Sequence, residues 1–286
     1  MLERQARRWE YLSLDQIKEL AKNTTSETIW GENLSRPNMV TSDILAGKEM
    51  NFIYDDGTWS YRFLDERHLH WQAPDGTSGD DLYNATLCPG EDSIVFFHHY
   101  RAGLELPKCV DMILDLSTGY TTLFDAFLGN PDCPREVLHT IRFGKVEGIK
   151  TPAGAEKPDF TDELTGKSIY WAHDEKSRGI QYIFSSCQYY TYSMVNREKK
   201  SCWMATNPAD YIKVKDGLYI VSVIEERQPG VQLVMLMNLN IMRDVQSCFG
   251  IGGTIAEGHR AETWMHANRF GRYGQMWTDL TDNALK

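Results

Sequence analysis

The sequence predicts a mainly β protein that consists of two copies of one small antiparallel barrel behind a short helix. Three observations lead to this fold class. Short runs of alternating apolar and polar residues follow one another between tight turns, as in 47–63, where Met50, Phe52 and Tyr54 share one face. Helical periodicity is almost absent after the first fifty residues. A related strand pattern returns after about 120 residues, which is too long for a solenoid or propeller repeat, so each copy is a domain.

Composition excludes several classes of protein. The chain has 286 residues, 42% of them hydrophobic, and a net charge of −10 without any Lys/Arg block, which argues against a nucleic-acid or anionic-membrane partner. No apolar run reaches the roughly 18 residues that a spanning helix needs, and no signal peptide is apparent. The six cysteines lack CxxC spacing. We therefore expect reduced thiols in a cytoplasmic protein, with no disulfide framework and no zinc or other metal site.

Residues 1–44 are expected to form an N-terminal helix and a lead into the first barrel. Ser13 is a candidate N-cap with Gln16 three residues later, and apolar residues recur at helical spacing over 13–22. Residues 23–46 are polar and rich in turn-forming residues. This segment is expected to connect the helix to the barrel or to cover one end of it.

The first barrel is expected over residues 45–150. Its opening hairpin turns at Asp56-Gly57, because Gly takes the positive φ that a primed turn needs. Many short strands between turn signals favour an antiparallel sandwich or an up-and-down barrel. The predicted strands are Met50–Tyr54, Trp59–Leu64, His68–Gln72, Leu82–Thr86, Ser93–Tyr100, Val110–Leu116 and Tyr120–Phe127.

The second barrel is expected over residues 151–286. Gly47-Lys48 corresponds to Gly166-Lys167, which places the start of the second copy. Residues 259–269 have helical character, so we expect a C-terminal helical tail. The predicted strands are Ser168–His173, Gly179–Phe184, Gln188–Val195, Ser201–Ala205, Tyr211–Val214, Leu218–Glu225, Val231–Asn238 and Ile241–Phe249.

Four stretches carry a family resemblance: 47–61, 83–97, 113–119 and 216–223. They resemble the molybdenum cofactor biosynthesis protein F family. The resemblance implies tandem lipocalin-like (calycin) domains over about residues 45–255. Nothing in the sequence resembles a pterin or nucleotide site, so no cofactor is expected.

The opening hairpin is also similar, more distantly, to that of phenolic acid decarboxylases, which are single-barrel enzymes without a cofactor. In these enzymes two strand tyrosines, an arginine and a glutamate surround a phenolic substrate. By position the tyrosines fall on Phe52 and Tyr54. The glutamate falls near Glu91 in the first copy and Asp216 in the second, and no arginine matches.

Polar groups that face a barrel interior are the candidates for function, because they are costly unless they are hydrogen-bonded. His98 and His99 are adjacent on a strand and point to opposite faces, so the inward one is expected to form an acid–base pair with Tyr54. The alternative is one solvated histidine at a strand end and one satisfied core histidine. Asp80 and Asp81 are expected in a solvated turn. Tyr61 and Tyr83 are the candidate substrate-binding residues of this barrel.

The second barrel offers a competing site. His173 and Glu225 are its candidate catalytic residues, and Tyr182, Tyr190 and Tyr211 are its candidate substrate-binding residues. Rings of this kind stack on a flat ligand while their hydroxyls orient it. The alternative is that these aromatic residues are present because they are good strand formers.

These features predict a cofactor-independent lyase, dehydratase or isomerase. It would act by general acid–base chemistry on a small aromatic or conjugated hydroxylated metabolite inside a barrel. The alternative is a non-catalytic lipocalin-like binding protein. In both cases the expected partner is a small hydrophobic or aromatic ligand, and the chain is compatible with a homodimer.

Overall fold

A computed structural model gives the fold of the chain. Within the described parts, no helix has the length and apolar character that crossing a membrane would take. The described residues are 12–26, 41–134, 136–172, 178–196, 201–225, 230–256 and 259–279.

The expected N-terminal helix is α1, Leu14–Lys22. Ser13 accepts a hydrogen bond from the Gln16 backbone N–H at 3.3 Å, and the Gln16 side chain accepts one from the Ser13 N–H at 2.9 Å. This reciprocal pair is the predicted capping box. The helix buries Ile17 at one end of the first barrel, beside the loop that follows Arg101.

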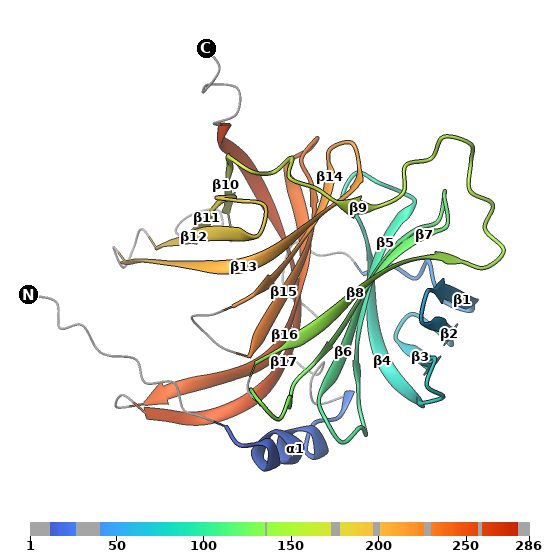
Figure 1. Cartoon of the computed structure of the whole chain (residues 1–286), viewed down its shortest axis with the longest axis horizontal. Helices are drawn as coiled ribbons and strands as arrows, with labels where there is room; N and C mark the ends of the chain where they lie inside the picture. Colours follow the sequence, from blue (N-terminus) through green and yellow to red (C-terminus); the bar gives the residue numbers. More distant parts are fainter. Residues whose placement is uncertain are drawn as a thin grey trace, which may run out of the picture.

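The first barrel is a closed antiparallel ring of eight strands in sequence order, drawn from blue to green in Figure 1. The mainly β fold is therefore confirmed. Its opening hairpin pairs Tyr54 with Gly57, which has the predicted positive φ of +134°. The eighth strand was not predicted from the sequence. The strands are β1 Glu49–Tyr54, β2 Gly57–Phe63, β3 His68–Gln72, β4 Ser78–Leu87, β5 Ile94–Arg101, β6 Lys108–Asp115, β7 Tyr120–Phe127 and β8 Leu138–Val146.

The ring closes where β8 pairs with β1, and Gly144 lies at this seam. A Cβ at position 144 would overlap the Ile53 carbonyl oxygen and lie 2.5 Å from a Tyr54 ring carbon. We expect Gly144→Ala to lower the free energy of unfolding by about 1–3 kcal/mol, the usual cost of overpacking, in urea denaturation. Gly148→Ala is the control, because there an added Cβ meets nothing and only the φ of +82° is strained. No loss of stability in Gly144→Ala would show that the seam tolerates a side chain.

The second barrel has the same plan. Each strand from β10 to β16 pairs with the next, and β17 pairs back with β10, so the ladders run around a ring of eight strands. β9 adds to its edge at β13. The strands are β9 Asp159–Phe160, β10 Lys167–Ala172, β11 Arg178–Ile183, β12 Tyr189–Asn196, β13 Ser201–Lys215, β14 Leu218–Ile224, β15 Val231–Asn238, β16 Arg243–Ala256 and β17 His259–Asp279.

Two expectations for the second barrel are wrong. Residues 259–269, expected to form a helical tail, belong to β17, because pairing with β16 satisfies their backbone and overrides a local preference. The two strands expected within 201–214 are one long strand, β13. Its first half pairs with β12 and its second half with β14, as the halves of β4 pair with β3 and β5.

The predicted repeat is confirmed at the start of each barrel. The N–H of Gly47 donates to the Phe63 carbonyl at 2.8 Å, and the N–H of Gly166 donates to the Phe184 carbonyl at 2.8 Å. Both glycines have positive φ, +73° and +85°. The same turn chemistry therefore opens both copies.

The two barrels pack against each other through the outer faces of their sheets, near the centre of Figure 1. Two apolar clusters cross this interface. Lys215 also pairs with Glu91 at 2.6 Å, and Asn238 donates to the Pro89 carbonyl at 2.8 Å. Buried members of the larger cluster are Ile94, Phe96, Ile113 and Phe124 from the first barrel and Ile212, Ile220, Val234, Leu236 and Val245 from the second.

Candidate functional site

β5 places its two histidines on opposite faces of the first barrel. Phe97 belongs to the interior core, whereas Phe96 packs against the second barrel. Side chains alternate along a strand, so His99 points into the barrel and His98 points outward. Both are fully buried. The alternative, in which one histidine is solvated at a strand end, is therefore wrong, because the second barrel covers the outer face of β5.

Inside the first barrel, Tyr61, His99 and Asp81 form a chain of polar contacts. The Tyr61 hydroxyl lies 3.1 Å from His99 Nε2, which is a hydrogen bond. Nδ1 of the same ring lies 3.8 Å from Asp81 Oδ2, which is too long for a hydrogen bond and becomes an ion pair when the imidazole is protonated. This arrangement places a carboxylate, an imidazole and a phenol in line.

The sequence suggested that Asp81 lies in a solvated turn, and this expectation is wrong. Asp81 is 5% exposed, on the inner face of β4, whereas the neighbouring Asp80 side chain is 76% exposed. The Asp81 carboxylate accepts hydrogen bonds from Trp71 Nε1 at 2.6 Å, Ser26 Oγ at 2.8 Å and the Ala102 N–H at 3.2 Å. These donors fix the carboxylate behind the imidazole.

The sequence predicted that Tyr54 pairs with the inward histidine. The structure gives Tyr54 a different partner. The Tyr54 hydroxyl lies 3.1 Å from Thr121 Oγ1 on β7. β1 lies beside β2 and β8 in the ring, so Tyr54 meets the β7–β8 side of the barrel, and β2 brings Tyr61 to His99 instead. An acid–base role for Tyr54 stays a prediction, without a histidine in contact.

Burial and local contacts set the charge states of Tyr61, His99 and Asp81. Burial raises the pKa of the Tyr61 hydroxyl well above its ordinary value. Burial lowers the pKa of His99, although Asp81 opposes this effect. The pKa of Asp81 is lowered, because its contacts with His99, Ser26 and Trp71 outweigh its burial. At neutral pH a phenol therefore faces a neutral imidazole with a carboxylate behind it.

A chain of ion pairs leads from the surface to the interior of the same barrel. Arg142 Nε bonds Asp56 Oδ2 at 2.5 Å, and its Nη1 lies 3.6 Å from Asp125 Oδ2. Asp125 in turn pairs with Arg101, the last residue of β5. The side chain of Asp56 is 45% exposed and that of Arg101 only 3%. Charged groups thus line the end of the barrel that contains the turn between β1 and β2.

Two buried N–H donors in the first barrel lack a hydrogen-bond partner among the described residues. The Arg101 guanidinium lies over the rings of Trp59 and Trp71, with Cζ at 5.1 Å and 5.5 Å from their centroids. Neither Arg101 Nε nor Trp59 Nε1 has a hydrogen-bond partner among the described residues, although both atoms are buried. An unsatisfied buried donor costs about 1–3 kcal/mol, so both groups are suited to an oxygen atom of a ligand.

A comparison with protein-family models matches residues 31–129 to the MoaF N-terminal domain. The first barrel resembles MoaF. The match spans β1 to β7 and includes Tyr61, Asp81, His99 and Arg101, and it confirms the family resemblance that the sequence suggested. No curated protein matches the chain. An eight-stranded barrel of this size either fills its interior with side chains or holds one small ligand.

Two of the expected binding tyrosines hold the backbone of the barrels together. In the MoaF-like barrel the Tyr83 hydroxyl donates to the Asp65 carbonyl at 2.8 Å, and in the second barrel that of Tyr211 donates to the Tyr189 carbonyl at 2.8 Å. Each hydroxyl thus donates to a backbone oxygen at a matching place in the two copies, and a substrate-binding role for either residue stays a prediction.

The carboxylates that align with phenolic acid decarboxylases lie outside both barrels. Glu91 pairs with Lys215 between the barrels, and Asp216 is 90% exposed and pairs with Lys213 at 2.8 Å. The MoaF-like barrel does contain a buried arginine, Arg101, which the resemblance to phenolic acid decarboxylases did not indicate. The decarboxylase set is therefore not assembled here.

The competing site in the second barrel is partly present. The Tyr192 hydroxyl lies 3.4 Å from Glu225 Oε1, and the rings of Tyr182 and Tyr190 meet edge to face at 5.0 Å. All four are buried. His173, the other expected catalytic residue of this barrel, lies outside the described residues. These four residues therefore give this interior a carboxylate and three tyrosine hydroxyls.

Sequence reasoning missed Asp81, Arg101, Asp125 and Trp59. One signal was available. Arg101 stands two residues after His99 on the same strand, so any register that turns His99 inward also turns Arg101 inward.

Proposed function

We propose that the MoaF-like barrel binds a small planar aromatic or conjugated hydroxylated metabolite and moves a proton on it, as a lyase, dehydratase or isomerase. The hydrogen bond between Tyr61 and His99, with Asp81 behind the imidazole, carries this proposal. It is the described contact in which an orienting carboxylate, a base and a phenol follow one another inside a barrel. The side chains supply the chemistry, without a cofactor.

The proton path follows from these contacts. The Tyr61 oxygen takes a proton from the substrate as its own proton passes to His99 Nε2, and Asp81 stabilises the imidazolium that forms. The proton then returns to another atom of the substrate or to a leaving hydroxyl. The N–H groups of Arg101 and Trp59 would bind the substrate oxygen that gains negative charge.

The alternative function is binding without turnover. The aromatic interior favours it: the ring centroids of Phe63 and Phe97 lie 5.4 Å apart, and those of Phe52 and Tyr61 lie 5.5 Å apart, both edge to face. A flat ligand would replace such ring–ring contacts with its own, whether or not a proton moves. Proton transfer to the bound ligand separates the two functions.

We also propose a cytosolic location, which the thiols of Cys88, Cys109, Cys133 and Cys187, none of them in a disulfide, support. The net charge of −10 supports a small ligand rather than a nucleic acid as the partner. A homodimer stays a prediction.

The test uses 4-hydroxycinnamate as the probe, because it combines a flat ring, a hydroxyl and a carboxylate. Trp59→Phe keeps a ring but removes one of the two free donors. It is expected to weaken binding about tenfold, the worth of one hydrogen bond, in titration calorimetry. Tyr83→Phe, which removes a hydroxyl held by the backbone, should bind the probe as the unaltered protein does.

The same probe reports on chemistry. Protonation of the carbon next to the carboxylate gives a quinone methide, and reversal in D2O leaves deuterium on that carbon. Deuterium incorporation that depends on the protein supports the enzyme, and binding without incorporation supports the carrier. If the probe does not bind, or if Trp59→Phe binds it equally well, the proposed ligand class and site are wrong.

A further inference from the structure

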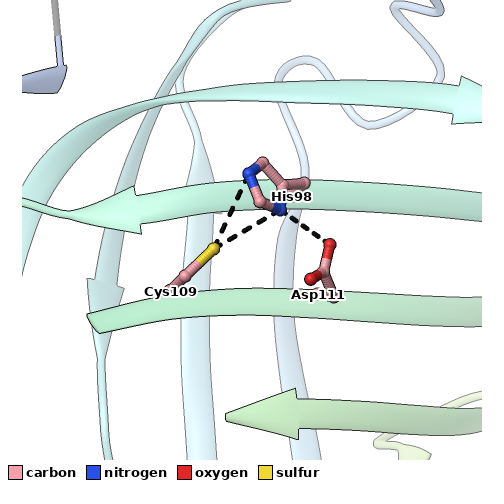
Figure 2. A group of neighbouring side chains, drawn as sticks. All are labelled: His98, Cys109 and Asp111. Atoms are coloured by element: carbon pink, nitrogen blue, oxygen red, sulfur yellow. Dashed lines mark hydrogen bonds and ion pairs between the residues drawn. The ribbon is translucent and has the colours of Figure 1, made fainter. Parts of the chain in front are cut away.

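A second group of reactive side chains lies on the outer face of the first barrel. Figure 2 shows the His98 imidazole on β5 facing the Cys109 thiol and the Asp111 carboxylate, both on β6. His98 Nδ1 lies 2.6 Å from Asp111 Oδ1 and 3.4 Å from Cys109 Sγ, which is 3.6 Å from Nε2. A nitrogen, a sulfur and an oxygen donor thus converge, with all donor atoms within 4.8 Å of one another.

The group lies in a polar layer between the two apolar clusters of the inter-barrel interface. On β5, outward His98 stands between Phe96 of the larger cluster and Tyr100 of the smaller one. On β6, Asp111 stands between Ile113 of the larger cluster and Cys109 of the smaller one. His98, Cys109 and Asp111 are at most 1% exposed. Water is therefore excluded from these three polar groups, which contact one another.

The second barrel has the same layer on its side of the interface. On β16, Ser247 stands between Val245 of the larger cluster and Phe249 of the smaller one. On β14, Ser222 stands between Ile220 of the larger cluster and Ile224, which packs against the smaller one.

Two polar atoms of this layer are unsatisfied. Neither the Ser247 hydroxyl nor Oε1 of Gln232, which lies opposite Phe249 on β15, has a hydrogen-bond partner in the described chain. Both residues are at most 1% exposed. Each such group costs about 1–3 kcal/mol. A species bound in the layer would account for them.

We propose that His98, Cys109 and Asp111 bind a divalent transition-metal ion of the zinc class between the two barrels. The fourth coordination position then faces the second barrel, on the side of Ser247 and Gln232. Imidazole nitrogen, thiolate sulfur and carboxylate oxygen are the ligands that zinc takes in proteins. The mixed set excludes magnesium and calcium, which prefer oxygen alone.

The distances fit such an ion after a small adjustment. In a tetrahedral zinc site, bond lengths of 2.0–2.3 Å place the ligand atoms about 3.3–3.6 Å apart. The distance from Cys109 Sγ to His98 Nδ1, 3.4 Å, already lies in this range. The distance between His98 and Asp111 would widen by about 0.7 Å as the metal replaces their hydrogen bond.

This site differs from the one proposed for chemistry. His98 and His99 lie on opposite faces of β5, so an ion at His98 would hold the barrels together rather than contact a substrate in the barrel. The sequence predicted no metal site, because positions 98, 109 and 111 match no metal-binding spacing. The β5–β6 register, which pairs His98 with Asp111, brings them together.

Metal content tests the proposal on the full chain. Protein isolated in the presence of zinc and then desalted is expected to retain one zinc ion per chain. Its cobalt form should show the near-ultraviolet absorption of a cobalt–thiolate bond. Cys109→Ser should lose both signals, and Cys88→Ser, a buried cysteine outside the group, should keep them.

Asp111→Asn is the second variant, because it nearly preserves shape. It should lower zinc affinity at least about tenfold and leave the helical and strand content of the protein unchanged by circular dichroism. Substoichiometric zinc in the unaltered protein would overturn the proposal. A cobalt–thiolate signal that survives Cys109→Ser would also overturn it, and would assign the metal to another cysteine.

Discussion

Replacing His99 by Gln should reduce proton transfer to a bound substrate by about 10²–10⁴, the usual contribution of general acid–base catalysis. Gln can still accept a hydrogen bond from Tyr61 through its side-chain oxygen, so the packing and the bond are largely retained. It cannot take up a proton at neutral pH. The proton of Tyr61 then has nowhere to go, and the phenol can no longer act as a base.

Tyr61→Phe should give a loss of the same size, because it removes the group that would touch the substrate. The measured quantity is the rate of deuterium incorporation into 4-hydroxycinnamate in D2O, with the probe at saturating concentration. His70→Gln is the matched control. Its side chain is 40% exposed and bonds Asp80 at 2.9 Å on the outside of β3, so it should leave the rate unchanged.

Three outcomes would change the assignment. If His99→Gln and Tyr61→Phe each lower the rate less than about threefold, these residues do not carry the proton. If Glu225→Gln then lowers it strongly, the second barrel, where Glu225 meets Tyr192, holds the active site. If no variant changes a measurable rate, or no rate is measurable although the probe binds, the carrier function stands.

The opening strands were predictable because burial alternates along β1, β2 and β3. In β1 every second residue is buried, and the sequence shows this directly. β8 was missed because its residues are almost all half-buried, without the alternation of a one-sided strand. β17 was taken for a helix because its apolar residues also recur at helical spacing, and the long ladder with β16 decides its conformation.

The candidate site was less predictable, because a shift of one residue exchanges the two faces of a strand. The sequence showed that one of His98 and His99 points inward, but not which one. Asp81 and Arg101 look like surface residues from their type. The burial of His98 depends on the second barrel, and no pattern within β5 reports that its outer face is covered.

The interface between the barrels leads to the second large expected effect. Phe96 is fully buried on the outer face of β5, in the cluster that contains Leu236 and Val245 of the second barrel. Phe96→Ala should lower the free energy of unfolding by about 3–5 kcal/mol, since the removed ring leaves a cavity that two rigid sheets cannot close. Leu64→Ala, at a position 50% exposed, should change it by less than about 0.5 kcal/mol.

Urea denaturation followed by fluorescence and circular dichroism tests this effect and the independence of the barrels. Because apolar clusters from both barrels are shared, we expect one transition in both signals, shifted to lower urea by Phe96→Ala without a change of slope. Two transitions, of which the variant shifts neither or only one, would show that the barrels fold separately and that the interface contributes little. In that case the predicted boundary near residue 150 would also divide two units of stability, and each barrel would have to be stabilised by its own aromatic core.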